Sequence, residues 1–422
     1  MQYKYLNSHI HTGNLVPEPG RVKFHYGIVR EKEAIQGSGC RAPDHRLEYG
    51  PMPVSSDLSL EDRVGQLFWI GFQGTCLGPD LRSLLDRVRP GGVIFFSRNI
   101  EKASQVRALT DDLFRSLRTP PFLALDQEGG RVNRLKPILG PIPANLDLAG
   151  RADATAAVHR HARATAAAMR SLGFNVNFAP VLDLSGRDPG NGIGDRAYGE
   201  DPRIVCRLAR VFLEAHLKAG VIPVGKHFPG LGSARADTHL TLPVISRSRA
   251  LLWKEDLLPY RRLRQKLPVV MAGHAYYPAI QGDGPSPATL SGSVAAGLLR
   301  RKVGYRGLIV TDDLEMGAVD QAQGAGRQAL SALAAGHDGL MFCGSEEKIR
   351  EAYETLLAAV REGKIETARV GLSVRRILRL KDRFLCRRRR APYSPEIVVR
   401  SRRVLASLGA GADSGHDPTV RP

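Results

Sequence analysis

The sequence predicts an α/β protein that forms one (β/α)8 barrel of the TIM type. Two observations support this fold class. Eight short apolar runs, each typical of a strand buried on both faces of a parallel sheet, alternate with helical patterns. Polar residues able to do chemistry follow several of these runs directly, as they do at the carboxyl-terminal rim of such barrels. The length of 422 residues suits one large α/β barrel or two smaller domains.

The predicted strands follow one another at the spacing of strand–helix units. They cover residues 66–71, 92–96, 122–126, 176–180, 221–227, 268–274, 307–312 and 339–342. Runs such as "PVVMAG" and "GLIV" lack alternating polar residues, which favours strands covered on both faces. The clearest helical patterns cover residues 154–172, 202–219, 291–303 and 346–361. Eight strands with helical crossovers are the number that closes this barrel.

The composition sets the expected boundaries of the barrel. Residues 1–55 show no sustained periodicity and form a poorly specified N-terminal extension, whereas residues 56–386 hold the strand–helix units. Residues 387–422 are predicted to be a basic, disordered tail that begins with the run "RRRR". Only one catalytic domain is therefore expected.

The net charge of +19 raises the possibility of a polyanionic partner. Between Arg375 and Arg403, twelve Lys and Arg residues face only Asp382 and Glu396, so much of the charge lies in one stretch. This concentration favours a solvated tail over specific nucleic-acid binding. We therefore expect no nucleic-acid partner, and the sequence leaves the oligomeric state open.

Cysteine usage and hydropathy indicate the compartment. The five cysteines are scattered without CxxC spacing, which argues against a disulfide framework and a zinc site. The sequence contains neither a secretory apolar region at its start nor an apolar run of membrane-spanning length. We therefore expect a soluble, cytoplasmic protein that needs no metal or other cofactor and has no membrane partner.

Candidate site residues stand where the barrel would use them. The residues at the carboxyl ends of predicted strands are Asp126, Lys226, His227, His274 and Asp312. A further donor, Arg196, lies in the glycine-flanked loop "GNGIGDRAYGEDP". Because the carboxyl ends of all eight strands meet at one rim, we expect these side chains to surround a common pocket.

The stretch "KHFPGLGSARADTHLTLP", residues 226–243, adds a second kind of group. Gly230 and Gly232 make its backbone permissive, and Asp237 lies two residues before His239. A carboxylate beside an imidazole can hold one tautomer and raise its basicity. An imidazole with an ordinary pKa of about 6.5 can serve as a general acid near neutral pH. Together with a strand-end carboxylate and hydroxyl-binding groups, this combination suits glycoside hydrolysis.

The chain resembles glycoside hydrolase family 3, in its β-N-acetylglucosaminidase (β-N-acetylhexosaminidase) branch. The resemblance runs from Leu60 to Lys381 and rests on the stretch 226–243 together with "LDQEGGRV", "NVNFAPVLDL", "GDRAYGEDP", "VMAGHAYYP" and "GLIVTDDLEMGA". It implies a retaining, exo-acting enzyme with Asp312 as the nucleophile, His239 as the acid/base and Asp237 as the partner of His239.

The same resemblance implies which residues hold the sugar and where it comes from. The implied sugar-contacting residues are Asp126, Arg196, Lys226 and His227, to which strand-end His274 is added. The implied role is peptidoglycan recycling, with release of N-acetylglucosamine from cell-wall fragments in the cytoplasm. One departure is Leu231, where the family usually has a second histidine. It concerns contacts of the loop and the leaving group rather than the acid/base itself.

Three alternatives stay open on the sequence. The same site could serve a phosphorylase, since a histidine acid/base repels phosphate less than a carboxylate does. It could serve a β-glucosidase of the same family. The basic tail could also belong to a non-catalytic nucleic-acid-binding protein, against which the set of strand-end residues argues.

Overall fold

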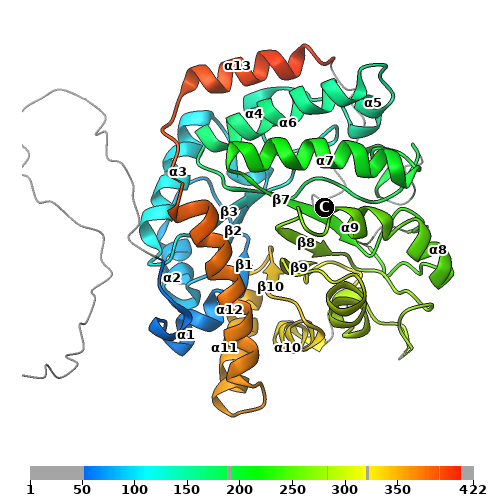
Figure 1. The fold of residues 1–422 in the computed structure, drawn as a ribbon. Helices are drawn as coiled ribbons and strands as arrows, with labels where there is room; N and C mark the ends of the chain where they lie inside the picture. The colour runs from blue at the N-terminus through cyan, green and yellow to red at the C-terminus, as the bar shows by residue number, and fades with distance from the viewer. Residues whose placement is uncertain are drawn as a thin grey trace, which may run out of the picture. The chain divides into compact units, whose positions relative to one another are not determined.

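Eight parallel strands close into a barrel, which confirms the predicted fold class (Figure 1). Around the barrel the hydrogen-bonded order is β1-β10-β9-β8-β7-β6-β3-β2. The strands are β1 (Phe68–Ile70), β2 (Gly92–Phe95), β3 (Phe122–Leu125), β6 (Val176–Asn177), β7 (Ile222–Phe228), β8 (Val269–Ala272), β9 (Leu308–Asp313) and β10 (Gly339–Phe342). The computed structural model describes residues 52–187, 190, 192–236, 238, 240–282, 284–319, 323–388 and 390–409.

Each of the eight predicted strands is found, and the differences are at the ends. The strand expected over 176–180 stops at Asn177, because Pro180 has no N–H for a ladder. A short antiparallel pair, β4 (Gln127–Gly129) and β5 (Val132–Asn133), follows β3 outside the barrel. Glu128, the middle residue of β4, belongs to the candidate active site.

Helices cover the outside of the barrel. They are α1 (Leu60–Gly65), α2 (Pro79–Val88), α3 (Ala103–Ser116), α4 (Lys136–Leu139), α5 (Asn145–Ala149), α6 (Ala154–Ser171), α7 (Pro202–Ala219), α8 (Arg249–Lys254), α9 (Leu258–Leu263), α10 (Ala325–Ala335), α11 (Glu346–Arg361), α12 (Thr367–Lys381) and α13 (Pro395–Ala406). The pattern over 291–303 forms a π-helix, Ser293–Lys302. The local signals of α7 are clear: Asp201 caps its first turn, Pro202 opens it, and Gly220 ends it at φ 81°.

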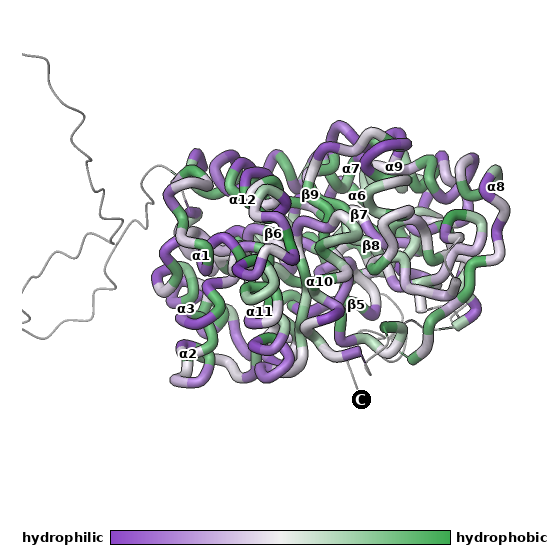
Figure 2. Tube along the Cα trace, turned by 90° about the horizontal axis from the view of Figure 1, so that it is seen from below, coloured by the Kyte–Doolittle hydropathy of each residue, from purple (hydrophilic) through white to green (hydrophobic). Residues whose placement is uncertain are grey.

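The hydrophobic core has two layers, inside the barrel and between barrel and helices. Inside, the rings of Trp69 and Phe122 stack with centroids 4.7 Å apart. Ile377 of α12 and Phe384 of the π-helix Asp382–Cys386 belong to this inner cluster, so the C-terminal helices close one end of the barrel. Hydrophobic segments accordingly gather around β9 in the middle of Figure 2. The other end stays open for the site.

The tail prediction is wrong for residues 395–406, which form α13 and pack along α6 and α4 (Figure 1). The helix starts at the Ser394 cap, whose hydroxyl accepts from Ile397 N, and buries Val398 and Leu405. Burial of these apolar side chains outweighs the basic composition that suggested disorder. Most of the N-terminal extension, residues 1–51, lies outside the described part of the chain. None of the helices that the structure describes is long and apolar enough to cross a membrane.

Candidate active site

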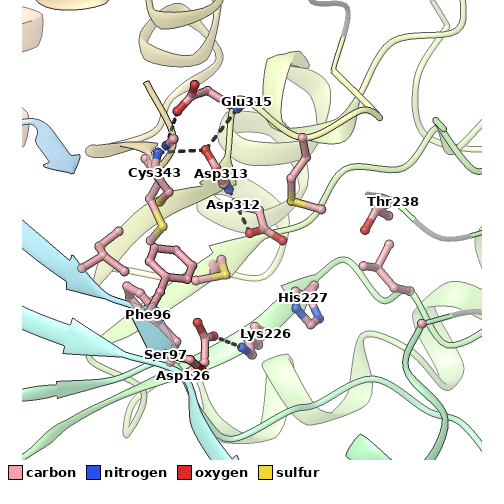
Figure 3. Close-up of a pocket in the computed structure, with 18 of the residues that line it drawn as sticks. Phe96, Ser97, Asp126, Lys226, His227, Thr238, Asp312, Asp313, Glu315 and Cys343 are labelled. Carbon is pink, nitrogen blue, oxygen red and sulfur yellow. Dashed lines mark hydrogen bonds and ion pairs between the residues drawn. The ribbon is translucent and has the colours of Figure 1, made fainter. Parts of the chain in front are cut away.

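A pocket of about 560 Å³ opens at the carboxyl ends of the strands. The predicted residues that line it are Asp126, Arg196, Lys226, His227 and Asp312. In Figure 3 the Asp312 carboxylate lies across the pocket from Lys226 and His227, and Asp126 lies beside Lys226. Four of the five predicted strand-end residues therefore converge on one pocket, together with Arg196.

A buried group of charges forms one wall of the pocket. Two of the three guanidinium nitrogens of Arg196, Nε and Nη2, donate to the two carboxylate oxygens of Glu128, each at 2.9 Å. The ammonium of Lys226 lies 2.6 Å from Glu128 Oε1 and 2.6 Å from Asp126 Oδ1. Glu128 is fully buried, and its contacts with Arg196 and Lys226 fix the directions of both cations.

The titration of this group follows from its contacts. Burial alone would raise the pKa of Glu128, but Arg196 and then Lys226 outweigh burial and lower that pKa strongly. Burial would likewise lower the pKa of Lys226, but Asp126 and Glu128 reverse the effect and raise it. The wall therefore keeps its charges near neutral pH and presents fixed donors and an acceptor, the groups that bind sugar hydroxyls.

His227 is oriented by a second buried carboxylate. Its ring Nδ1 lies 2.6 Å from Asp183 Oδ2, and its backbone N–H donates to the same oxygen at 3.2 Å. Because a carboxylate oxygen accepts, Nδ1 carries a proton that it donates to Asp183. The opposite nitrogen, Nε2, lies 3.5 Å from Arg196 Nη2 at the pocket wall.

Asp312 and Asp313 end β9 with different partners. Asp313 N donates to Asp312 Oδ1 at 2.9 Å, while Asp313 Oδ1 accepts from the backbone N–H groups of Glu315 and Cys343. Asp313 thereby holds the local backbone, and Asp312 presents a carboxylate to the pocket.

The charge state of Asp312 is set by its neighbours. Burial alone would raise the pKa of the Asp312 carboxyl. Electrostatic attraction from the imidazoles of His227 and His274 opposes burial most strongly, and the Asp313 N–H and the Lys226 ammonium add to it. The net effect lowers the pKa of Asp312 below its usual value, so a nucleophilic carboxylate is present near neutral pH.

His274 does not lie where the prediction put it. It is fully buried and is not among the residues that line the pocket. Its Nδ1 lies 2.8 Å from Thr289 Oγ1 and its Nε2 lies 2.9 Å from the Asp313 carbonyl oxygen. His274 thus contacts the backbone of Asp313, next to Asp312, and we assign it this positioning role in place of the expected sugar contact. Strand-end position alone could not separate a residue facing the mouth from one facing the barrel wall.

Asp237 and His239 lie outside the described residues. Thr238, between them in sequence, lines the pocket and is 8% exposed. Its carbonyl oxygen accepts a 3.0 Å hydrogen bond from Ala318 N, six residues after Asp312. The loop that carries the proposed acid/base therefore reaches the pocket at Thr238.

Glu128 and Asp183 were missed by sequence reasoning. Both occur in quoted motifs, Glu128 in "LDQEGGRV" and Asp183 in "NVNFAPVLDL". Each carboxylate lies a few residues after a predicted strand, and this position was the signal available in the sequence. Among the described residues, no group of three or more His, Cys, Asp or Glu is arranged to hold a metal ion.

Comparison with known proteins identifies the family. The family model described as "Glycosyl hydrolase family 3 N terminal domain" matches residues 59–380. The chain belongs to glycosyl hydrolase family 3. This membership confirms the resemblance inferred from the motifs and makes the protein a glycoside hydrolase, an enzyme that acts on carbohydrate.

Named relatives of this family 3 enzyme include a beta-hexosaminidase of Alkalilimnicola ehrlichii, 42% identical over 286 residues, which are 66% of this chain and 81% of the relative. A beta-hexosaminidase of Pseudomonas aeruginosa is 35% identical over 69% of this chain and 85% of its own length. A solved family 3 beta-N-acetylglucosaminidase from Paenibacillus superposes with a TM-score of 0.76 at 34% identity, covering 83% of this chain and 68% of that one.

Proposed function

We propose that this family 3 hydrolase is a retaining, exo-acting β-N-acetylglucosaminidase. The names of its relatives support the sugar, because beta-hexosaminidases and a beta-N-acetylglucosaminidase recur among them. The observation that carries the mechanism is the position of Asp312. Its half-buried carboxylate, with a lowered pKa, faces the hydroxyl-binding wall of Asp126 and Lys226 across the pocket (Figure 3).

In this mechanism the chemistry has two displacements. The Asp312 carboxylate attacks the anomeric carbon, while His239 gives its proton to the glycosidic oxygen and the aglycone leaves as an alcohol. His239 then removes a proton from water, which attacks the same carbon and returns Asp312 as a free carboxylate. Asp237 orients the imidazole. The wall formed by Asp126, Arg196, Lys226 and His227 binds the sugar hydroxyls throughout.

We propose peptidoglycan fragments with a terminal β-linked N-acetylglucosamine as the natural substrates, cleaved in the cytoplasm as part of cell-wall recycling. An exo-acting enzyme suits a pocket of this size at the end of the barrel, because the terminal sugar enters the pocket and the remainder of the fragment stays outside. The test compares GlcNAc-anhydroMurNAc with chitobiose. Faster turnover of chitobiose would contradict the peptidoglycan assignment.

The decisive experiment is turnover of aryl glycosides followed by product identification. We expect free N-acetylglucosamine, of retained β-configuration, from an aryl N-acetyl-β-glucosaminide, and much slower release from the matched β-glucoside. Hexosamine-1-phosphate as the main product in phosphate buffer would make the enzyme a phosphorylase. Faster release from the glucoside would make it a β-glucosidase.

A further inference from the structure

The loop that carries Asp237 and His239 is held at both ends by one dipeptide. At its start, the hydroxyl of Tyr277 donates to the carbonyl oxygen of Gly230 at 2.8 Å. At its end, Tyr276 N donates to Pro243 O at 2.9 Å, and Ile245 N donates to Tyr276 O at 2.8 Å. Tyr276 and Tyr277 follow β8, a barrel strand next to the strand from which the loop departs.

The start of the loop has little room to move in this arrangement. Gly230 has a φ of 134°, a conformation that side-chain-bearing residues rarely adopt. A Cβ on Gly232 would lie 1.7 Å from the carbonyl oxygen of Leu184, so the backbone there is in close contact with its neighbour. Between them, Leu231 N donates to Asp183 Oδ1 at 2.7 Å. A shift of the Gly230 carbonyl would therefore move the backbone of Leu231 and Gly232 with it rather than be absorbed at the start of the loop.

Two side chains hold this start, and they differ in what else they touch. Asp183 also binds the ring and the backbone of His227, so its replacement would disturb the sugar-binding wall. Tyr277 is fully buried and does not line the pocket. The carbonyl oxygen of Gly230, in the loop, is the one hydrogen-bond partner described for its hydroxyl. Burial, then the charges of Asp183 and Asp256, raise the pKa of Tyr277 well above its ordinary value, so the hydroxyl remains a donor across the working pH range.

We propose that Tyr277 is a positioning residue for the acid/base loop. Its hydroxyl fixes the Gly230 carbonyl and with it the direction in which residues 230–245 leave the barrel, and so the distance of His239 from the glycosidic oxygen. This inference rests on the proposed role of His239 as the acid/base. It assigns a catalytic consequence to a side chain that touches neither the sugar nor the reacting atoms.

The test is Tyr277→Phe, which keeps the ring and removes the hydroxyl. For a disaccharide with a poor leaving group, kcat/KM should fall about tenfold, which corresponds to about 1.4 kcal/mol. For an aryl glycoside whose leaving group needs little protonation, the loss should stay within about twofold. Amide hydrogen exchange should accelerate in peptides covering residues 230–245 and stay unchanged in the barrel strands.

Tyr260→Phe is the matched control. Tyr260 is a neighbouring buried tyrosine whose ring packs edge-on against Phe228, with centroids 5.0 Å apart. Within the described part of the chain its hydroxyl has no hydrogen-bond partner. Its removal should leave both kcat/KM values and the exchange of the loop unchanged. Equal effects of the two substitutions would overturn the proposal, because they would reflect general loosening of the core.

His239→Ala separates failure of this inference from failure of the proposed function. If that variant loses equally on all leaving groups, His239 is not the acid and the proposed mechanism falls. If kcat/KM of His239→Ala falls most on substrates with poor leaving groups, but kcat/KM of Tyr277→Phe shows no such dependence, only the role of Tyr277 is overturned. In the double variant, Tyr277→Phe should add no more than about twofold to the loss on the disaccharide, because the acid that it positions is gone. Multiplied losses would contradict the proposal.

Discussion

At the scale of single residues, the buried carboxylate of Glu128 shows how the pocket wall is built. A buried ion pair adds little net stability, because desolvation offsets the attraction between its charges. Its value lies in geometry: two bonds to Arg196 and one to Lys226 leave both cations with fixed directions toward the pocket. A sugar then meets donors that need no rearrangement.

We predict that Glu128→Gln destabilises the fold and impairs catalysis together. The variant leaves two buried cations with a neutral partner, so the free energy of unfolding should drop by roughly 3 kcal/mol. Misaligned donors should lower kcat/KM about 10- to 100-fold. Chemical denaturation and steady-state kinetics measure the two effects.

Glu214→Gln is the matched control for Glu128→Gln. Glu214 also accepts from an arginine and a lysine, Arg210 at 2.9 Å and Lys266 at 2.6 Å, but its side chain is 44% exposed. Its loss should cost less than about 1 kcal/mol and leave kcat/KM unchanged. Similar losses in the two variants would show that burial is not what gives Glu128 its importance.

A second prediction at this scale concerns Asp312. Asp312→Ala should abolish turnover in a folded protein, because the glycosyl-enzyme intermediate cannot form without its carboxylate. A slow fluorinated N-acetylglucosaminide should label the peptide that contains Asp312 in the wild-type enzyme. A label on Asp313 or Glu315, both of whose carboxylates bind backbone N–H groups, would contradict the assignment.

The residue scale also shows how far sequence could lead. Asp126, Lys226 and Asp312 were predictable because strand ends of a parallel barrel meet at one rim. The roles of Glu128 and Asp183 depend on partners 68 and 44 residues away, Arg196 and His227. No local pattern encodes such pairings, so those roles required the fold.

At the scale of elements, α13 is the part of the chain that composition concealed. Its exposed face carries Arg400, Arg402 and Arg403, and these residues suggested a solvated tail. Its buried side chains Val398, Ser401 and Leu405 follow the three- and four-residue spacing of a helix face. That spacing was the available signal. By contrast, the barrel strands were predictable because short, continuous apolar runs between regular helical crossovers are typical of strands buried on both faces.

We predict that α13 contributes stability and takes no part in catalysis. Leu405 is fully buried, so Leu405→Ala should lower the free energy of unfolding by about 2–4 kcal/mol. Ile397 on the same helix is 42% exposed, and Ile397→Ala should cost less than about 1 kcal/mol. Activity per folded molecule should be unchanged in both, and thermal denaturation with active-site titration tests this. A folded but inactive Leu405→Ala variant would place α13 in the site after all.

At the scale of the whole molecule, the net charge of +19 acquires a structural role. Three arginines of the C-terminal region donate to carbonyls at helix ends: Arg369 to Leu333 O of α10 at 2.9 Å, Arg388 to Leu217 O of α7 at 3.2 Å, and Arg390 to Gly173 O just after α6 at 2.9 Å. Cations there complement the negative ends of the helix dipoles. Part of the basic stretch therefore joins outer helices together, which the expectation of a wholly solvated tail did not foresee.

Acid sensitivity is a further property of the whole molecule. His161, His216 and His337 are fully buried, and burial lowers their pKa values to about 4, 3 and 4. A depressed histidine pKa means that the unfolded chain takes up protons first as pH falls. The contribution of these neutral, buried rings to the free energy of unfolding is therefore greatest above the unfolded pKa of about 6.5 and decreases progressively below it. Asp256 acts in the opposite sense, because burial raises its pKa to about 6.

We predict that His161→Leu flattens this pH dependence. Among the described residues neither ring nitrogen of His161 has a hydrogen-bond partner, and the ring packs near Phe212, so an apolar side chain should fit. Between pH 7 and pH 5 the wild type should lose about 2 kcal/mol more than the variant, since one buried histidine no longer resists protonation. Urea denaturation at the two pH values measures the difference, and Asp256, present in both proteins, cancels. His159→Leu, on the exposed face of the same helix, should keep the wild-type slope. If His161→Leu keeps that slope too, protonation of His161 does not drive the acid sensitivity.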